Sequence, residues 1–229
     1  MTKAQRDELV SELTSFYEFL VGLHLPADAL KRPPPGGWPG ITQERLGFLN
    51  KDDDVIDVLR HIPYITRDDH LERIEIHREL VCNDYTGAYF ETSGIKYRNA
   101  TISEPLSDDS VDSSIATLAR PPESDGYFLT YNTAEHTVDL FDEVVGKSEY
   151  FGGVKKFFEM LKNEYRELSA VPVKLDRVIL ASDNKNRDFA QLQALYRRYG
   201  WPMEPLREES AKKDCLREAD DLAEKLDLI

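Results

Sequence analysis

Cysteine is scarce in this chain of 229 residues, which contains only Cys82 and Cys215. Two cysteines so far apart are too few for a disulfide framework. The first eight residues alternate in charge and do not place an apolar run after a basic start, so they do not match a secretory signal. We therefore expect a reducing compartment, either the cytoplasm or the nucleus.

Long hydrophobic runs and an excess of positive charge are also missing. No apolar stretch approaches the roughly 18–20 residues that a membrane-spanning helix needs. The chain has 29 Lys and Arg against 43 Asp and Glu, a net charge of -14. Such a charge repels phosphate backbones and anionic lipid headgroups. The sequence therefore predicts that neither nucleic acid nor a membrane is a partner.

Sequence motifs for catalysis and metal binding are absent as well. The chain has no G-x-S-x-G, no H-E-x-x-H, no cysteine pair and no nucleotide-binding glycine pattern. Its five histidines lack the spacing of metal ligands, and the alternation around His77 predicts that its side chain faces outward. We therefore expect no metal and no cofactor, and we assign no catalytic residue. A pair of carboxylates acting together remains open, because 43 acidic residues bring some close by chance.

The apolar content, in contrast, is that of a folded chain. Hydrophobic residues make up 41% of the sequence, and the length suits one domain over residues 1–229. Helical spacing of apolar residues predicts a helix over 3–25 and two short helices between 42 and 59. Between them, the proline- and glycine-rich segment 31–40 is predicted to be a loop, anchored by Trp38.

Short β-rich runs occupy the middle of the chain. They predict strands at 73–80, 85–90, 115–118, 127–131 and 137–141, and the polar residues between the last two favour a hairpin. We therefore expect an α+β fold in which an antiparallel sheet of about five to six strands packs against helices.

The C-terminal part reads as mainly helical. Residues 154–168 form a broad apolar helical face, and Gly152 and Gly153 before it read as a flexible helix start. Residues 169–229 are predicted to form an extension with two short strands followed by two helices.

Negative charge is concentrated in one stretch of the chain. Residues 101–150 hold eleven acidic and two basic residues, which gives this stretch -9 of the total -14. An acidic sheet face would attract a basic protein partner and speed its association. The candidate partner-binding residues are Asp108, Asp109, Asp112, Asp139, Asp142 and Glu143. The alternative is that these charges serve solubility and protect a sheet edge.

A second hypothesis is a small-molecule or enzymatic pocket between the sheet and the helices. Its candidate lining residues are Trp38, His61, Tyr64, His77, Tyr85 and Tyr127. Aromatic residues are also ordinary core residues, so this pattern leaves both interpretations open.

Three segments together suggest a family. They are Asp125–Asn132 (DGYFLTYN), Thr137–Phe141 (TVDLF) and Val154–Leu161 (VKKFFEML). This order resembles the SUKH superfamily of yeast cell-wall-synthesis regulators and bacterial toxin-immunity proteins. The resemblance covers residues 5–168, with the helix Ile41–Leu59 at the family's Leu-Pro segment, although the Leu-Pro start and the closing Asn-Gly are missing. It implies a non-catalytic scaffold that binds other proteins, and no catalytic residue carries over.

Overall fold

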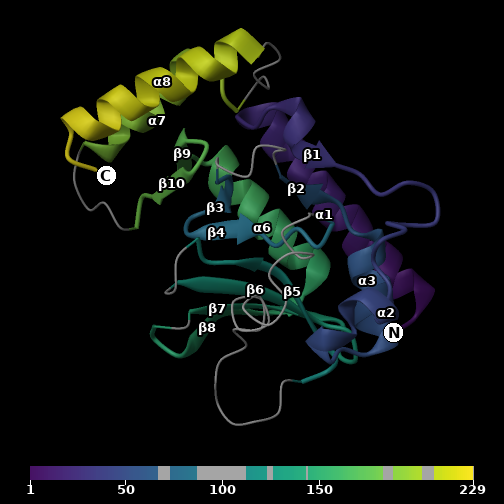
Figure 1. Ribbon diagram of the computed structural model, residues 1–229. Helices are drawn as coiled ribbons and strands as arrows, with labels where there is room; N and C mark the ends of the chain where they lie inside the picture. Colours follow the sequence, from purple (N-terminus) through teal and green to yellow (C-terminus); the bar gives the residue numbers. More distant parts are fainter. Residues whose placement is uncertain are drawn as a thin grey trace.

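The fold is described from a computed structural model. The described residues are 1–66, 73–86, 112–122, 126–142, 144–182, 188–202 and 209–228. They form a mixed α+β structure with helices at both ends of the chain, as the sequence predicts (Figure 1). None of the described helices is both long enough and apolar enough to cross a membrane.

A six-stranded antiparallel sheet lies at the centre, in the order β3-β4-β5-β6-β7-β8. Neighbouring strands in the sheet are also successive in the chain. The strands are β3 (Glu75–His77), β4 (Leu80–Cys82), β5 (Ile115–Arg120), β6 (Tyr127–Asn132), β7 (Thr137–Asp142) and β8 (Lys147–Gly153). The predicted antiparallel sheet of five to six strands is therefore confirmed.

Two long helices pack together in the core. In α1 (Lys3–Leu23), the Thr2 side chain and the Gln5 side chain cap each other's backbone at the N-terminus. In α6 (Val154–Arg166), which follows β8 directly, an apolar face is buried. The rings of Phe16 and Phe158 lie 5.7 Å apart between the two helices. The apolar side chains that recur at helical spacing in both helices are thus buried between the helices and against the sheet.

Shorter elements complete the N-terminal half. They are the 3-10 helices η1 (Ala27–Ala29) and η2 (Gly47–Leu49), the helices α2 (Gln43–Leu46) and α3 (Asp53–His61), and the paired strands β1 (Leu30–Lys31) and β2 (Tyr64–Ile65). The proline-rich loop is anchored by Trp38, as predicted, because its indole N–H donates to the Ile62 carbonyl at 2.9 Å.

The C-terminal part is a hairpin followed by two helices. It comprises β9 (Ala170–Lys174), β10 (Arg177–Leu180), α7 (Phe189–Arg198) and α8 (Glu209–Lys225). Figure 1 shows α7 and α8 side by side, away from β7 and β8. Trp201 attaches this part to the centre, because its indole N–H donates to the Tyr165 carbonyl of α6 at 2.8 Å. Nearly all buried hydrophobic residues form one cluster, which runs from Leu9 to Leu228, while Val81 and Phe128 are buried outside it.

Three sequence-based expectations need correction. Residues 73–80 are not one strand but belong to the tight hairpin of β3 and β4, where Glu79 turns the chain with a φ of 53°. His77 does not face outward but is 6% exposed, because all three residues of β3 are buried. Gly153 is the N-cap of α6, as the predicted helix start requires, but Gly152 and Gly153 also end β8, a strand that the sequence did not predict.

Candidate functional site

The acidic candidates do not gather in one place. Asp112 lies just before β5, and its carboxylate accepts hydrogen bonds from the Ser114 N–H at 2.9 Å and the Ser114 hydroxyl at 2.7 Å. These bonds stabilise the carboxylate and lower the pKa of Asp112. Asp142 lies at the last position of β7, next to the β7–β8 turn. Asp108, Asp109 and Glu143 fall outside the described residues.

Asp139 and Asp142 project from opposite faces of the sheet. Asp139 pairs with Thr130 across β6, whereas Asp142 pairs with Tyr127, and three positions along a strand reverse the face. The carboxylate of Asp142 accepts from the N–H groups of Val144 and Val145 in the turn. Partial burial raises the pKa of Asp139. The two aspartates therefore cannot meet the same flat partner surface.

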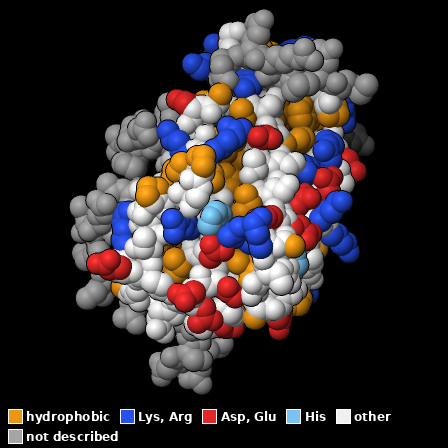
Figure 2. Space-filling model, turned by 90° about the vertical axis from the view of Figure 1, so that its right-hand side faces the viewer, with side chains coloured by type: hydrophobic (Ala, Val, Ile, Leu, Met, Phe, Trp, Pro, Cys, Tyr) orange, Lys and Arg blue, Asp and Glu red, His pale blue; other side chains and the backbone are white. Residues whose placement is uncertain are grey.

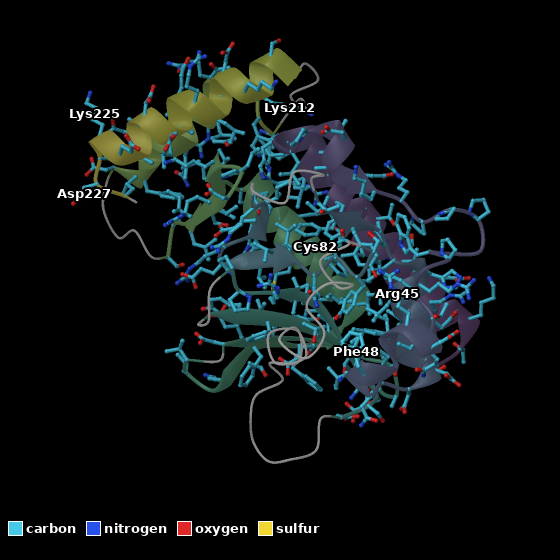
Figure 3. All side chains as sticks on the ribbon, viewed as in Figure 1. Arg45, Phe48, Cys82, Lys212, Lys225 and Asp227 are labelled. Atoms are coloured by element: carbon cyan, nitrogen blue, oxygen red, sulfur yellow. The ribbon has the colours of Figure 1, made fainter. Side chains whose placement is uncertain are left out.

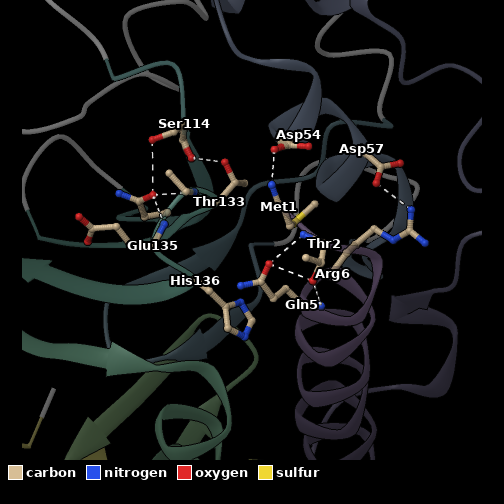
Figure 4. A network of polar contacts seen from close by, with 12 residues as sticks. Met1, Thr2, Gln5, Arg6, Asp54, Asp57, Ser114, Thr133, Glu135 and His136 are labelled. Atoms are coloured by element: carbon tan, nitrogen blue, oxygen red, sulfur yellow. Dashed lines mark hydrogen bonds and ion pairs between the residues drawn. The ribbon is translucent and has the colours of Figure 1, made fainter.

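The structure instead assembles acidic residues from three segments at the opposite end of β7. The Asp52 N–H donates to the Ser113 carbonyl at 3.0 Å, and the Thr133 N–H donates to the Ser114 carbonyl at 2.9 Å. These bonds hold the start of α3, the start of β5 and the β6–β7 turn side by side (Figure 4). The exposed carboxylates of this group, which we call the acidic end, are Asp52, Asp53, Asp112 and Glu135.

Two cationic groups bond to residues in this area. The Lys51 ammonium donates to the Asp112 carbonyl at 2.9 Å, and the Met1 ammonium pairs with Asp54 at 2.5 Å. On the side of the molecule turned toward the viewer in Figure 2, acidic side chains gather toward the lower part, and most Lys and Arg side chains lie higher.

Three of the aromatic pocket candidates lie together. The rings of Trp38 and Tyr64 are 5.9 Å apart, and those of Tyr64 and Tyr85 are 6.3 Å apart. Their polar atoms are occupied by backbone carbonyls: Tyr64 donates to Leu59 at 2.6 Å, and Tyr85 donates to Thr117 at 3.0 Å. In this arrangement the three side chains join the proline-rich loop, α3 and β5.

The polar atoms of the other three pocket candidates bond to residues outside this group. His61 donates from Nδ1 to the Asp57 carbonyl of its own helix at 2.7 Å. His77 donates from Nε2 to Glu164 at 2.7 Å. Tyr127 donates to the Glu149 carboxylate of β8 at 2.7 Å. The structure therefore does not bring the six residues to one site.

Glu75, a buried acidic residue of β3, is not marked by any sequence motif. Its carboxylate accepts from the Val178 N–H of β10 at 2.7 Å, and its own N–H donates to the Leu175 carbonyl at 2.8 Å. Glu75 is only 4% exposed, and this burial raises its pKa to about 7. No local pattern could have revealed this, because the partner residues are about a hundred positions away in the chain.

Two further buried groups are distinctive. His24 is 2% exposed, and neither ring nitrogen has a hydrogen-bond partner among the described residues. Burial, aided by the nearby Lys212 ammonium, lowers the pKa of His24 to about 3. Cys82, the last residue of β4 (Figure 3), is partly buried, and its desolvation raises the pKa of its thiol to about 12. A thiol with that pKa is not a thiolate nucleophile at neutral pH.

The free edge of the sheet carries exposed apolar side chains. Among the described residues, the large hydrophobic side chains that stand out to solvent are Val144 (70% exposed), Val145 (68%) and Phe151 (62%). All three belong to the hairpin of β7 and β8. Val144 and Val145 lie in the turn before β8, and Phe151 lies farther along that strand.

No group of three or more His, Cys, Asp or Glu side chains suited to a metal occurs among the residues that the structure describes. Comparison with known proteins gives no matching family model, no matching curated protein and no matching solved structure.

Proposed function

We propose that this protein is a non-catalytic interaction module of the cytoplasm that binds a basic protein partner through the acidic end. The single observation that carries this proposal is the placement of Asp52, Asp53, Asp112 and Glu135 at one end of the sheet. Backbone hydrogen bonds fix the three segments that carry them, so the negative field has a defined shape. A basic surface would be steered toward such a field.

The charge of the whole chain supports the choice of a basic partner. The net charge of -14 repels anionic partners at a distance, and the acidic end adds a local concentration of the same sign. The resemblance of residues 5–168 to the SUKH superfamily also favours a protein-binding scaffold. We extend that resemblance to the proposal that the partner is a protein in cell-wall signalling or toxin neutralisation.

The test removes the four charges without changing side-chain size. A variant with Asp52→Asn, Asp53→Asn, Asp112→Asn and Glu135→Gln keeps an oxygen acceptor at each position. We expect binding of a deca-lysine probe, followed by fluorescence anisotropy at low salt, to weaken about tenfold because several screened surface charges act together. Binding by the unchanged protein should also fall steeply as salt is raised.

A matched control neutralises the same number of exposed acids elsewhere, with Asp28→Asn, Asp176→Asn, Asp221→Asn and Glu167→Gln. Both variants lose the same net charge, so only location differs. If the control weakens probe binding as much as the acidic-end variant does, total charge is responsible and the proposed site is refuted. Capture of partners from cells with each variant then identifies the protein that depends on the acidic end.

A further inference from the structure

β8 is an edge strand of the central sheet as far as the described residues show. It bonds to β7 on one side, and no described strand lies on its other side. Residues at alternate positions of β8 are exposed, from Lys147 to Gly153. The edge is also seven residues long, whereas natural edge strands without a partner are commonly short or covered.

The charged side chains of β8 are complementary to those of a second, antiparallel copy of β8. Lys147 and Glu149 are both exposed and stand two positions apart, with Ser148 between them. Glu149 lies opposite no residue of β7, where the register shifts, and its carboxylate accepts from Tyr127 at 2.7 Å. A second β8 running antiparallel to the first would present the same charges in reverse order.

Symmetry leaves few registers for such a pairing. Residues that face each other across two antiparallel strands point to the same side of the sheet. The two-fold axis of such a pair must therefore lie midway between one residue of β8 and the same residue of the other copy, and we name each axis by that residue. An axis at Lys147 or at Glu149 places like charges opposite each other. An axis at Tyr150 places Glu149 opposite Phe151, an axis at Phe151 places Glu149 opposite Gly153, and an axis at Gly152 or Gly153 leaves Glu149 opposite no residue of β8. An axis at Ser148 places Lys147 of each copy opposite Glu149 of the other.

We propose that two copies of this chain pair through their β8 strands, with the two-fold axis at Ser148, so that the two sheets become one. Opposite charges directly across a strand pair stabilise it, and this register makes that contact twice. It also brings the turn with Val144 and Val145 of one copy toward Phe151 of the other, which covers the exposed apolar side chains. The interface is small and the two chains have the same net charge, so the dimer is a weak one.

Charge reversal tests the register directly. Lys147→Glu alone, or Glu149→Lys alone, places two like-charged pairs in the interface, and we expect the dimer dissociation constant to rise about tenfold. The double variant Lys147→Glu with Glu149→Lys restores opposite charges, and we expect it to return to within about threefold of the unchanged protein. Sedimentation velocity over a range of protein concentrations, in moderate salt, measures all four proteins.

One further variant tests the apolar part of the interface. Phe151→Ser should weaken the dimer about tenfold because the apolar contact is lost. A monomer at the highest concentration, single reversals without effect, or a double variant that stays dissociated would each overturn the proposal. Deca-lysine binding to the same samples reports on the acidic end separately, so either proposal can fail alone.

Discussion

The carboxylate of Glu75 accepts a hydrogen bond from the backbone N–H of Val178 at 2.7 Å. This contact joins β3, at one edge of the central sheet, to the β9–β10 hairpin, which packs on α8. A buried carboxylate therefore holds the C-terminal part to the sheet. Because burial raises the pKa of Glu75 to about 7, this contact involves proton uptake near neutral pH.

Folding stability should depend on pH through Glu75. The folded-state pKa is above the unfolded value, so the folded state holds a proton that the unfolded state releases, and the contribution of Glu75 to stability falls as pH rises from 4.5 to 7. Glu75→Gln removes this dependence and keeps an oxygen acceptor for Val178. We expect the difference in unfolding free energy between variant and unchanged protein to grow by roughly 3 kcal/mol over this range. Urea unfolding at several pH values measures it, and parallel curves for the two proteins would show that Glu75 titrates normally.

His24 should make folding stability depend on pH in the opposite direction. Its pKa of about 3 in the folded state lies below the unfolded value of 6.5, so the unfolded state binds the extra proton and stability falls as pH drops from 6.5 toward 3. His24→Met fills a similar volume with an apolar group that needs no hydrogen bond. We expect this variant to be more stable than the unchanged protein at pH 5, with the gain shrinking toward pH 7. Equal stability of both proteins at pH 5 would contradict the burial of a neutral His24.

The hydroxyl group of Tyr165 should contribute to folding stability. It donates to the Ile76 carbonyl of β3 at 3.0 Å in a buried position. Tyr165→Phe leaves that carbonyl without its donor, which costs about 1–3 kcal/mol of unfolding free energy. The control is Tyr150→Phe, because the Tyr150 hydroxyl bonds to the Gly153 carbonyl in an exposed position where water can replace it. Thermal or urea unfolding should show a clearly larger loss for Tyr165→Phe than for the control.

Two adjacent glycines in the proline-rich loop offer a second matched pair. Gly36 and Gly37 both have positive φ, at 87° and 84°. A Cβ at Gly37 would lie 2.6 Å from the Arg60 carbonyl oxygen, whereas a Cβ at Gly36 would meet nothing within 4 Å. Gly36→Ala should therefore cost about 1 kcal/mol from backbone strain alone, and Gly37→Ala distinctly more. Equal losses in urea unfolding would mean that the loop moves away from Arg60 at little cost.

The regular elements were predictable where a local pattern is repeated. Leu9, Leu13 and Phe16 recur at helical spacing, and that spacing correctly predicted α1. The hairpin of β6 and β7 followed from two β-rich runs around a polar turn. By contrast, β8 has few apolar residues and lies at the sheet edge, so its pairing with β7 left no hydrophobic alternation to find.

The candidate sites were less predictable, because they depend on contacts between distant residues. The expected acidic group is divided: Asp112 and Asp142 lie near opposite ends of the sheet, and Asp139 points to the other face from Asp142. Asp52 joins Asp112 instead, although some sixty positions separate them. The aromatic candidates are likewise split between core packing and separate polar contacts.

The sequence by itself determined the helices, most of the sheet and the excess of negative charge, because these follow from the spacing and type of neighbouring residues. Only the tertiary structure decided that His77 is buried, that Glu75 meets Val178, and that the acidic end draws on three separate segments. Burial and the meeting of distant charges depend on how the elements pack, and packing is a property of the whole chain.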